Sequence, residues 1–140
     1  MAQSQQLTLS VVTPESSIVT DVAVESIILP GEEGQLTILP GHINFITPLR
    51  PGTFAYKVGG EFQIAFLSGG FAQVFNGNVS VLAETLDMAQ DLDLAATELS
   101  VAEYKRELEA LKVGTAEYSA LVEKRDFALA KIRTAQKKIH

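Results

Sequence analysis

Apolar and polar residues alternate with a period of two over much of residues 1–86, as in β-strands that bury one face. In the segment LTLSVV, Leu7, Leu9 and Val11 share one face, and TFAYKV, EFQIAFL and FAQVF are further runs of strand length. Turn signals separate these runs at short intervals. The pattern predicts an antiparallel β-sandwich or a flattened barrel.

Glycine-containing dipeptides between the apolar runs indicate tight turns. Gly59-Gly60 and Asn76-Gly77 each join two such runs, and both dipeptides supply the positive φ angles that a two-residue β-hairpin loop requires. Pro-Gly pairs at 30–31, 40–41 and 51–52 mark further turns. These signals predict short strands joined by short connections.

After residue 86 the spacing of apolar residues changes to about 3.6, the period of an α-helix. Asp87 or Asp91 can cap a first helix, because a carboxylate accepts hydrogen bonds from the free N–H groups of a helix start. This helix is expected to reach about Val113, where Gly114 is a suitable stop and Thr115 a suitable cap for a second helix. Two helices with so short a connection predict an antiparallel hairpin.

Charge changes at the same point of the chain. Residues 1–86 carry seven acidic and two basic side chains, whereas residues 87–140 carry ten acidic and nine basic ones. We therefore expect an α+β chain in two parts. An antiparallel β-sandwich domain occupies residues 1–86, and an antiparallel two-helix hairpin domain occupies residues 87–140.

The second predicted helix is basic. Residues 115–140 have a net charge of +3, against −4 for residues 87–113, so the two arms of the hairpin are complementary. One interpretation of the basic residues is a solvated face with cations near the C-terminal dipole end, and the other is a docking surface for an acidic partner. The residues concerned are Lys124, Arg125, Lys131, Arg133, Lys137 and Lys138.

Composition excludes several classes of function. Apolar residues make up 46% of the chain and charged residues 20%, as in folded globular proteins. The net charge of −6 argues against nucleic-acid binding, which needs a surplus of Lys and Arg. The absence of cysteine excludes disulfides, thiolate metal ligands and cysteine nucleophiles. Since neither a secretory signal nor a transmembrane run of about 18 apolar residues is present, we expect a cytoplasmic protein.

Candidate catalytic residues are few. His42, in the segment LTILPGHINF, is the only histidine before His140, so any Ser-His-Asp arrangement would depend on it. A contact role is the better interpretation of a lone histidine after Pro-Gly. The DLD sequence at 91–93 lacks the glycine and distal glutamate of a calcium loop, and no phosphate-binding glycine pattern is present. We predict no catalytic residue, no metal site and no cofactor.

The order of these features resembles the epsilon subunits of F-type ATP synthases over the whole chain. The resemblance is carried by GEEGQLTILPGH, FLSGGFAQV and NVSVLAE, followed by DLDLAATELSVAEYKRELEAL and a basic second helix. It implies a sandwich of about ten strands in a non-catalytic subunit of the central stalk. It also implies partners: the gamma subunit, the membrane-embedded c-ring, and the alpha and beta subunits of the catalytic head.

The resemblance implies a mode of action as well. Such a subunit couples gamma to the c-ring during proton-driven ATP synthesis, and its helical hairpin can extend and inhibit ATP hydrolysis. The implied location is peripheral, at the cytoplasmic face of a bacterial inner membrane. The two hairpin forms should differ by only a few kcal/mol, and the basic residues listed above would then meet the catalytic head.

Contact residues follow from the same resemblance. The loops that contact the c-ring and gamma fall on Glu33, Gln35, Gly41, His42 and Asn44. Many relatives have an acid where this chain has Gln35. The resemblance therefore implies a neutral hydrogen bond to the ring at this position instead of a salt bridge.

Some relatives bind ATP at the hairpin through an I/L-D-x-x-R-A motif. Leu92 and Asp93 match its start, but Ala96 stands at the arginine, and Phe127 and Lys131 stand at two further arginine positions. Guanidinium groups make bidentate phosphate contacts that alanine and phenylalanine cannot replace. We therefore predict that the motif is degenerate and that ATP binding is weak or absent.

Two other functions stay open. One is a small β-sandwich module that binds a ligand or hydrolyses a substrate, with Glu32, Glu33 and His42 in a cleft. Such a site requires these side chains to converge in one pocket. The other is a protein-interaction adaptor whose helical hairpin is permanently docked on the sandwich.

Overall fold

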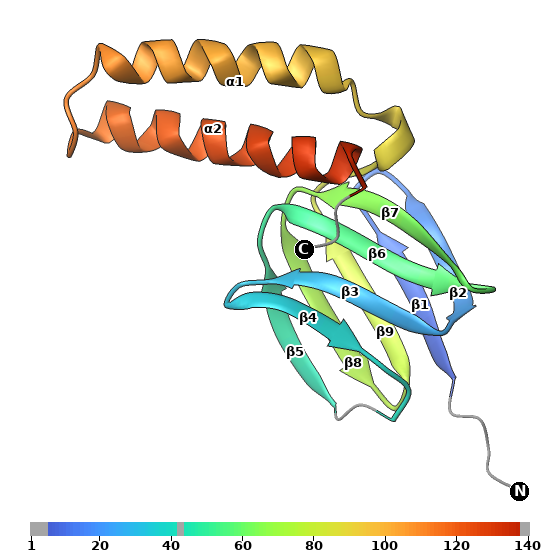
Figure 1. The fold of residues 1–140 in the computed structure, drawn as a ribbon. Coiled ribbons are helices and arrows are strands. Elements are labelled where there is room, and N and C mark those ends of the chain that lie inside the picture. The colour runs from blue at the N-terminus through green and yellow to red at the C-terminus, as the bar shows by residue number, and fades with distance from the viewer. Residues whose placement is uncertain (1–5, 42–43, 138–140) are drawn as a thin grey trace, which may run out of the picture.

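The structure, a computed structural model, describes residues 6–41 and 44–137 of the chain. Ten strands come first and a pair of helices follows, which confirms the predicted order (Figure 1). The strands are β1 (Leu7–Val12), β2 (Ser17–Val24), β3 (Ser26–Gly31), β4 (Gly34–Ile38), β5 (Phe45–Leu49), β6 (Gly52–Val58), β7 (Glu61–Leu67), β8 (Gly70–Phe75), β9 (Asn78–Ala83) and β10 (Leu86–Met88). The helices are the short 3₁₀ helix η1 (Ala89–Asp91), α1 (Leu94–Glu109) and α2 (Ala116–Ala135).

The strands form two layers that share one hydrogen-bonded order, β10–β7–β6–β3–β5–β8–β9–β1–β2, with β4 paired to β3. The layers are joined by a narrow link, because β3 and β5 pair only at Gly31 and Leu49. In Figure 1, β3, β4, β6 and β7 lie in front of β5, β8, β9 and β1. The predicted antiparallel sandwich is confirmed, with one parallel pair between β1 and β9. These two strands are far apart in sequence, so no local turn signal reveals their pairing.

The core lies between the two layers. Alternation places Leu7, Leu9 and Val11 on the inner face of β1, where they are fully buried, as predicted. Phe54 of β6 and Leu67 of β7 join the same cluster from the other layer. Because apolar burial is the dominant favourable term in folding, this cluster gives the sandwich a core of its own.

Both predicted two-residue turns are present. The φ angle is +59° at Gly59 and +82° at Gly60, and it is +50° at Asn76 and +80° at Gly77. The first turn joins β6 to β7 and the second joins β8 to β9, in each case as an antiparallel pair in regular register.

The first helix begins later than predicted. Asp93 caps α1 by accepting a hydrogen bond from the backbone N–H of Ala96. The prediction that Asp87 or Asp91 would be the cap is wrong, because Asp87 lies in β10 and Asp91 in η1. These two elements continue the chain along the sandwich before the helix starts.

The first helix also ends earlier than predicted, at Glu109 instead of about Val113. The backbone N–H of Ala110 donates to the carbonyl oxygens of Glu107 and Leu108, and this tighter last turn ends the helix. Gly114 has a φ of +92° in the connecting turn. Thr115 caps α2 as predicted, by accepting a hydrogen bond from the N–H of Tyr118.

In the described part of the chain, neither helix is long and apolar enough to cross a membrane.

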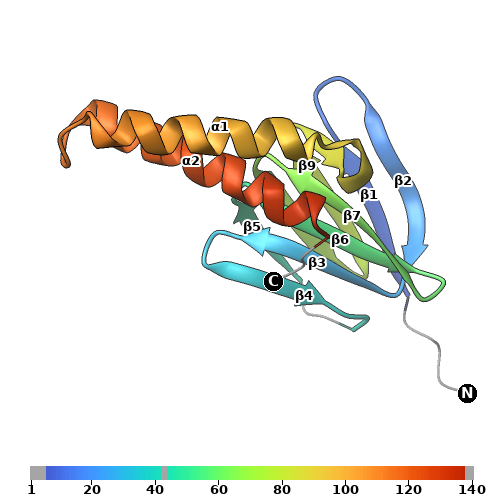
Figure 2. The same cartoon turned by 45° about the horizontal axis from the view of Figure 1, so that its top comes forward.

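The helical hairpin rests on the sandwich through α2. This helix contacts β6, β7 and η1, whereas α1 packs against α2 and makes no comparable contact with a described strand. Figures 1 and 2 show that the turn between the helices projects past the edge of the sandwich. Ile28, Ala55 and Phe66 are buried although they do not belong to the core between the layers. The helical hairpin therefore covers an apolar outer surface of the β3–β6–β7 layer.

Candidate functional site

The outer surface of the β5–β8–β9–β1 layer carries exposed apolar side chains. Four of them, Ile46, Phe71, Phe75 and Leu82, have exposed fractions between 54% and 67%. A contiguous exposed apolar surface marks a site of protein interaction more often than chance, because water is a poor solvent for it. We call this surface the apolar face, and its members are Val12, Ile46, Pro48, Phe71, Phe75 and Leu82.

Strand register makes the apolar face contiguous. Val12 is aligned with Leu82, Leu82 with Phe71, and Phe71 with Pro48, so one row crosses four strands. Directly aligned side chains on one face have Cβ atoms about 4.5–5.5 Å apart in antiparallel pairs. The two other members lie an even number of residues along β5 and β8, which places them on the same face. The helical hairpin contacts the other layer and leaves this face open.

Sequence reasoning missed the apolar face, although a signal was present. The segment FAQVF puts apolar residues on both sides of β8, since Ala72 and Val74 are buried while Phe71 and Phe75 are exposed. A strand with one solvated face should have polar residues at the exposed positions. Two phenylalanines there indicate a partner on the outer side.

The predicted contact residues lie in two places, at opposite ends of β4. Glu33 is exposed in the β3–β4 turn, and Gln35 is exposed at the start of β4. Gly41 and Asn44 are exposed beyond the other end of β4. At about 3.3 Å per residue, a strand of this length separates the two places by about 16 Å. The Asn44 carboxamide oxygen accepts a hydrogen bond of 2.8 Å from the N–H of Asn76 and so ties its loop to the β8–β9 turn.

The enzyme-like alternative depends on Glu32, Glu33 and His42. Both glutamates are exposed in the β3–β4 turn and line a groove of about 420 Å³ beside β5. His42 lies outside the described residues, so its approach to the two carboxylates stays a prediction. Within residues 6–41 and 44–137, no group of three or more His, Cys, Asp or Glu side chains is arranged to hold a metal ion.

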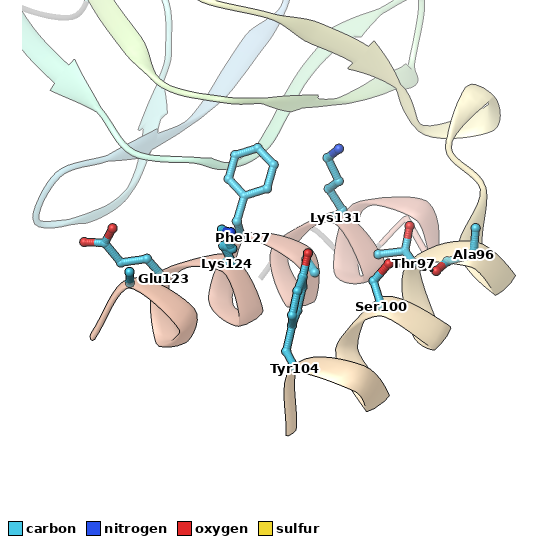
Figure 3. A pocket seen from close by; sticks show the side chains of 10 residues that line it. Ala96, Thr97, Ser100, Tyr104, Glu123, Lys124, Phe127 and Lys131 are labelled. Atoms are coloured by element: carbon cyan, nitrogen blue, oxygen red, sulfur yellow. Dashed lines mark hydrogen bonds between the residues drawn. The ribbon is translucent and has the colours of Figure 1, made fainter. Parts of the chain in front are cut away.

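A groove of about 630 Å³ runs between α1 and α2 on the side that faces the strands (Figure 3). It is lined by Ala96, Phe127 and Lys131, the three positions at which the resemblance implies arginine in ATP-binding relatives. Lys124 and Glu123 contribute charges of opposite sign. No arginine lines this groove among the described residues. The lining therefore offers an anionic ligand little of the bidentate contact that guanidinium groups supply.

The basic residues of α2 do not all face solvent in this form. Lys131 turns toward the sandwich, with its Nζ atom 5.7 Å from the ring centroid of Phe66. Arg125 pairs with its neighbour Asp126, with 3.2 Å between Nη2 and Oδ1. Lys138 lies outside the described residues. Lys124 and Arg133 of α2 are exposed, as is Lys137 just after the helix.

Comparison with known sequences identifies the family. Residues 6–89 match the family described as ATP synthase, Delta/Epsilon chain, beta-sandwich domain. The ATP synthase epsilon chain of Nitratidesulfovibrio vulgaris (strain DSM 19637 / Miyazaki F) is 42% identical over 90 residues, which cover 64% of this chain and 66% of that relative. The match thus spans just under two thirds of the relative's length.

Two further relatives extend the match toward the C-terminus. The epsilon chain of Desulfosudis oleivorans is 36% identical over 108 residues, or 76% of this chain and 80% of that one. The epsilon chain of Syntrophobacter fumaroxidans is 27% identical over 134 residues, or 96% of this chain and 98% of that one.

Solved structures share the fold. A chain in the Euglena gracilis mitochondrial ATP synthase OSCP/F1/c-ring assembly has a TM-score of 0.80 at 20% identity, covering 100% of this chain and 85% of that one. A chain in the Tetrahymena thermophila mitochondrial ATP synthase central stalk/c-ring has a TM-score of 0.60 at 14% identity, covering 99% and 100%. The family match over residues 6–89 and the identity to bacterial relatives together show that the chain belongs to the ATP synthase delta/epsilon family, as an epsilon chain.

Proposed function

We propose that the chain is a non-catalytic subunit of the ATP synthase central stalk that binds gamma through its apolar face. In this role it couples gamma to the c-ring during proton-driven ATP synthesis. Its helical hairpin restrains ATP hydrolysis when it leaves the sandwich and enters the catalytic head. The assembled complex then holds the chain peripherally at the cytoplasmic face of a bacterial inner membrane.

The observation that carries this proposal is the apolar face. Its central row runs across four strands and is exposed, whereas the inner positions of the same strands, such as Ala72 and Val81, are buried. A partner with an apolar surface would remove this area from water, at about 25 cal/mol for each Å². Gamma is the partner that the epsilon-chain family suggests, and the face stays free when the helical hairpin is docked.

The c-ring contact is proposed for the exposed loops at the two ends of β4. Glu33 lies at the first end, next to Gln35 at the start of β4, and Gly41 and Asn44 lie beyond the second end. His42, which the proposal also includes, lies outside the described residues. Exposed polar side chains on short loops are suited to contact the polar loops of a membrane-embedded ring without penetrating the bilayer. The tie between Asn44 and the β8–β9 turn supports this role, because it fixes the loop beside the apolar face.

The inhibitory role is proposed for the basic residues of α2. Released from the sandwich, this helix would present Lys131 together with the basic residues that are already exposed. Such a surface complements acidic segments of the alpha and beta subunits. The proposal gives the helical hairpin two partners, the sandwich in one form and the catalytic head in the other.

Capture of the purified chain by immobilised gamma tests the proposal. We expect Leu82→Glu and Phe71→Glu to lower the affinity at least about tenfold each, because both place a charge in the middle of an apolar interface. Leu99→Glu is the matched control, since Leu99 is 71% exposed on α1, far from the apolar face. Wild-type chain that fails to bind gamma would refute the proposal, as would Leu82→Glu binding as tightly as Leu99→Glu.

A further inference from the structure

Aromatic and cationic contacts fasten the helical hairpin to the sandwich at one place. The Phe127 ring of α2 meets the Phe66 ring of β7 edge to face, with 5.0 Å between centroids and 84° between planes. The Nζ atom of Lys131 lies 5.1 Å from the centroid of Phe127 and 5.7 Å from that of Phe66. Figure 3 shows Phe127 and Lys131 projecting from α2 toward the strands. Lys131 thus makes a cation–π contact with one ring of the sandwich and one ring of the helical hairpin.

A hydroxyl pair adds to this contact about two helical turns further along α2. Thr134 is the one polar residue that is fully buried in the described part of the chain. Its Oγ1 atom donates to the Ala130 carbonyl at 3.1 Å and lies 2.6 Å from Oγ1 of Thr53 on β6. Because the single Thr134 proton is used within the helix, Thr53 is the donor between the two hydroxyls.

Each part of the molecule keeps its own packing without this contact. Phe66 is fully buried, yet it does not belong to the core cluster between the two layers, which contains its strand neighbours Ala65 and Leu67. On the other side, Val101 and Leu108 of α1 are buried in a helix that packs only against α2 among its larger contacts. Separation of the two parts therefore exposes the contact residues but leaves the sandwich core and the helix pair intact.

We propose that Phe66, Phe127, Lys131 and the Thr53–Thr134 hydroxyl pair form a latch that holds the helical hairpin on the sandwich without a bound nucleotide. The latch opens and closes as a unit, since all its members lie on one face of α2 or directly opposite on β6 and β7. Phe127 and Lys131, which line the groove between the helices, serve this contact instead of a phosphate. The use of the latch in the assembled enzyme rests on the proposed function, but its existence is a property of the isolated chain.

Thiol labelling of the full-length chain measures undocking directly. The chain has no cysteine, so a single introduced thiol gives the whole signal. Ala130→Cys reports undocking, because Ala130 is 4% exposed and lines the cleft between α2 and the β5–β6 turn. Val101→Cys is the matched reporter for opening of the helix pair, since Val101 is 7% exposed on α1. The rate of reaction with Ellman's reagent is proportional to the fraction of molecules in which the thiol is open.

With the Ala130→Cys reporter, we expect Phe127→Ala to raise the labelling rate about tenfold, which corresponds to about 1.4 kcal/mol. Thr53→Val should raise it about threefold, and this change lies on the sandwich, where it cannot unfold the helix. Lys131→Met keeps the aliphatic stem and should also raise the rate about threefold through loss of the cation. Lys124→Ala, which removes an exposed lysine of the same helix, should leave it unchanged.

Three outcomes overturn the latch. The first is an unchanged Ala130→Cys rate in Phe127→Ala and Thr53→Val. The second is an equal rise with the Val101→Cys reporter, which would mean that the helices separate instead of undocking together. The third is a labelling rate of the Ala130→Cys chain, without further substitution, that falls severalfold on addition of MgATP, which would mean that a nucleotide holds the hairpin on the sandwich. None of these results affects capture by gamma, so the latch and the proposed function fail independently.

Discussion

Asp93 and Ala96 are joined by a hydrogen bond of 3.0 Å from the Ala96 backbone N–H to the Asp93 carboxylate, and this bond starts helix α1. The aspartate of the degenerate nucleotide motif therefore serves as a helix cap. The residue that it caps is the one at the arginine position of ATP-binding relatives. Leu92, the other matching residue, precedes the cap as the C-terminal boundary of η1.

Loss of this cap should destabilise the helical hairpin. Asp93→Ala leaves a free N–H at the start of α1 and removes a negative charge that interacts favourably with the helix dipole. We therefore expect the stability of the helical hairpin to fall by about 1 kcal/mol. The measurement is helix melting followed by circular dichroism. Asp91→Ala is the control, since Asp91 is exposed in η1, which has no side-chain cap. Equal melting of the two variants would contradict the assignment of the cap.

ATP binding should be weak or absent. Among the described residues, the groove between the helices has no arginine, and both Phe127 and Lys131 turn toward the strands. Titration calorimetry of the full-length chain with MgATP should give no saturable heat at micromolar concentration. Ala96→Arg adds a guanidinium at the mouth of the groove and should bind more tightly than the unmodified chain. Saturable micromolar binding by the unmodified chain would refute the prediction.

Local patterns in the sequence predicted the strands, the two tight turns and the Thr115 cap, because each depends on a few neighbouring residues. The start of α1 was missed because Asp87, Asp91 and Asp93 are chemically equivalent caps. Pairing with β7 decides among them, since it draws Asp87 into β10. That pairing is a tertiary contact and leaves no local signal.

The contact between Phe66 and Phe127 in the latch could not be predicted from the sequence either. In EFQIAFL, Phe66 and Leu67 are both buried, one on each side of β7. The sequence thus indicates that something covers the outer side but not what covers it. Phe127 on α2 supplies the cover, with its ring edge to face against that of Phe66. Only the crossing of α2 over β6 and β7 brings the two rings together.

Gly70 should be hard to replace. Its φ is +143°, and a Cβ atom at this position would clash with the Leu82 carbonyl oxygen on β9. Gly70→Ala should therefore lower the free energy of unfolding by at least about 2 kcal/mol, because the backbones of β8 and β9 must move apart. Gly60→Ala is the matched control, because Gly60 also has a positive φ but has open space around it. This substitution should lower the free energy of unfolding by only about 1 kcal/mol. Urea unfolding compares them, and equal losses would contradict the clash.

Tyr56 should make the chain less stable in alkali. Burial raises the pKa of the Tyr56 hydroxyl above its ordinary value of 10.0. As the pH rises, the unfolded state therefore loses this proton before the folded state does. The contribution of the protonated Tyr56 hydroxyl to the free energy of unfolding is complete below pH 10.0 and is lost as the pH rises through the raised pKa. Tyr56→Phe removes this dependence. Denaturant unfolding from neutral pH upward should give a shallower alkaline decline for the variant, and parallel curves would contradict the prediction.

Locking the helical hairpin onto the sandwich should relieve inhibition of ATP hydrolysis. The Oγ1 atoms of Thr53 and Thr134 are 2.6 Å apart, so Thr53→Cys together with Thr134→Cys places two thiols within reach of a disulfide bond in a chain without other cysteines. In the assembled enzyme, oxidation with copper phenanthroline should raise ATP hydrolysis to the level found after deletion of residues 87–140, because the locked hairpin cannot enter the catalytic head. Reduction should restore inhibition, and each sample serves as its own control. A permanently docked adaptor predicts the same hydrolysis rate in the oxidised, reduced and truncated enzymes, which would refute the inhibitory role of the hairpin.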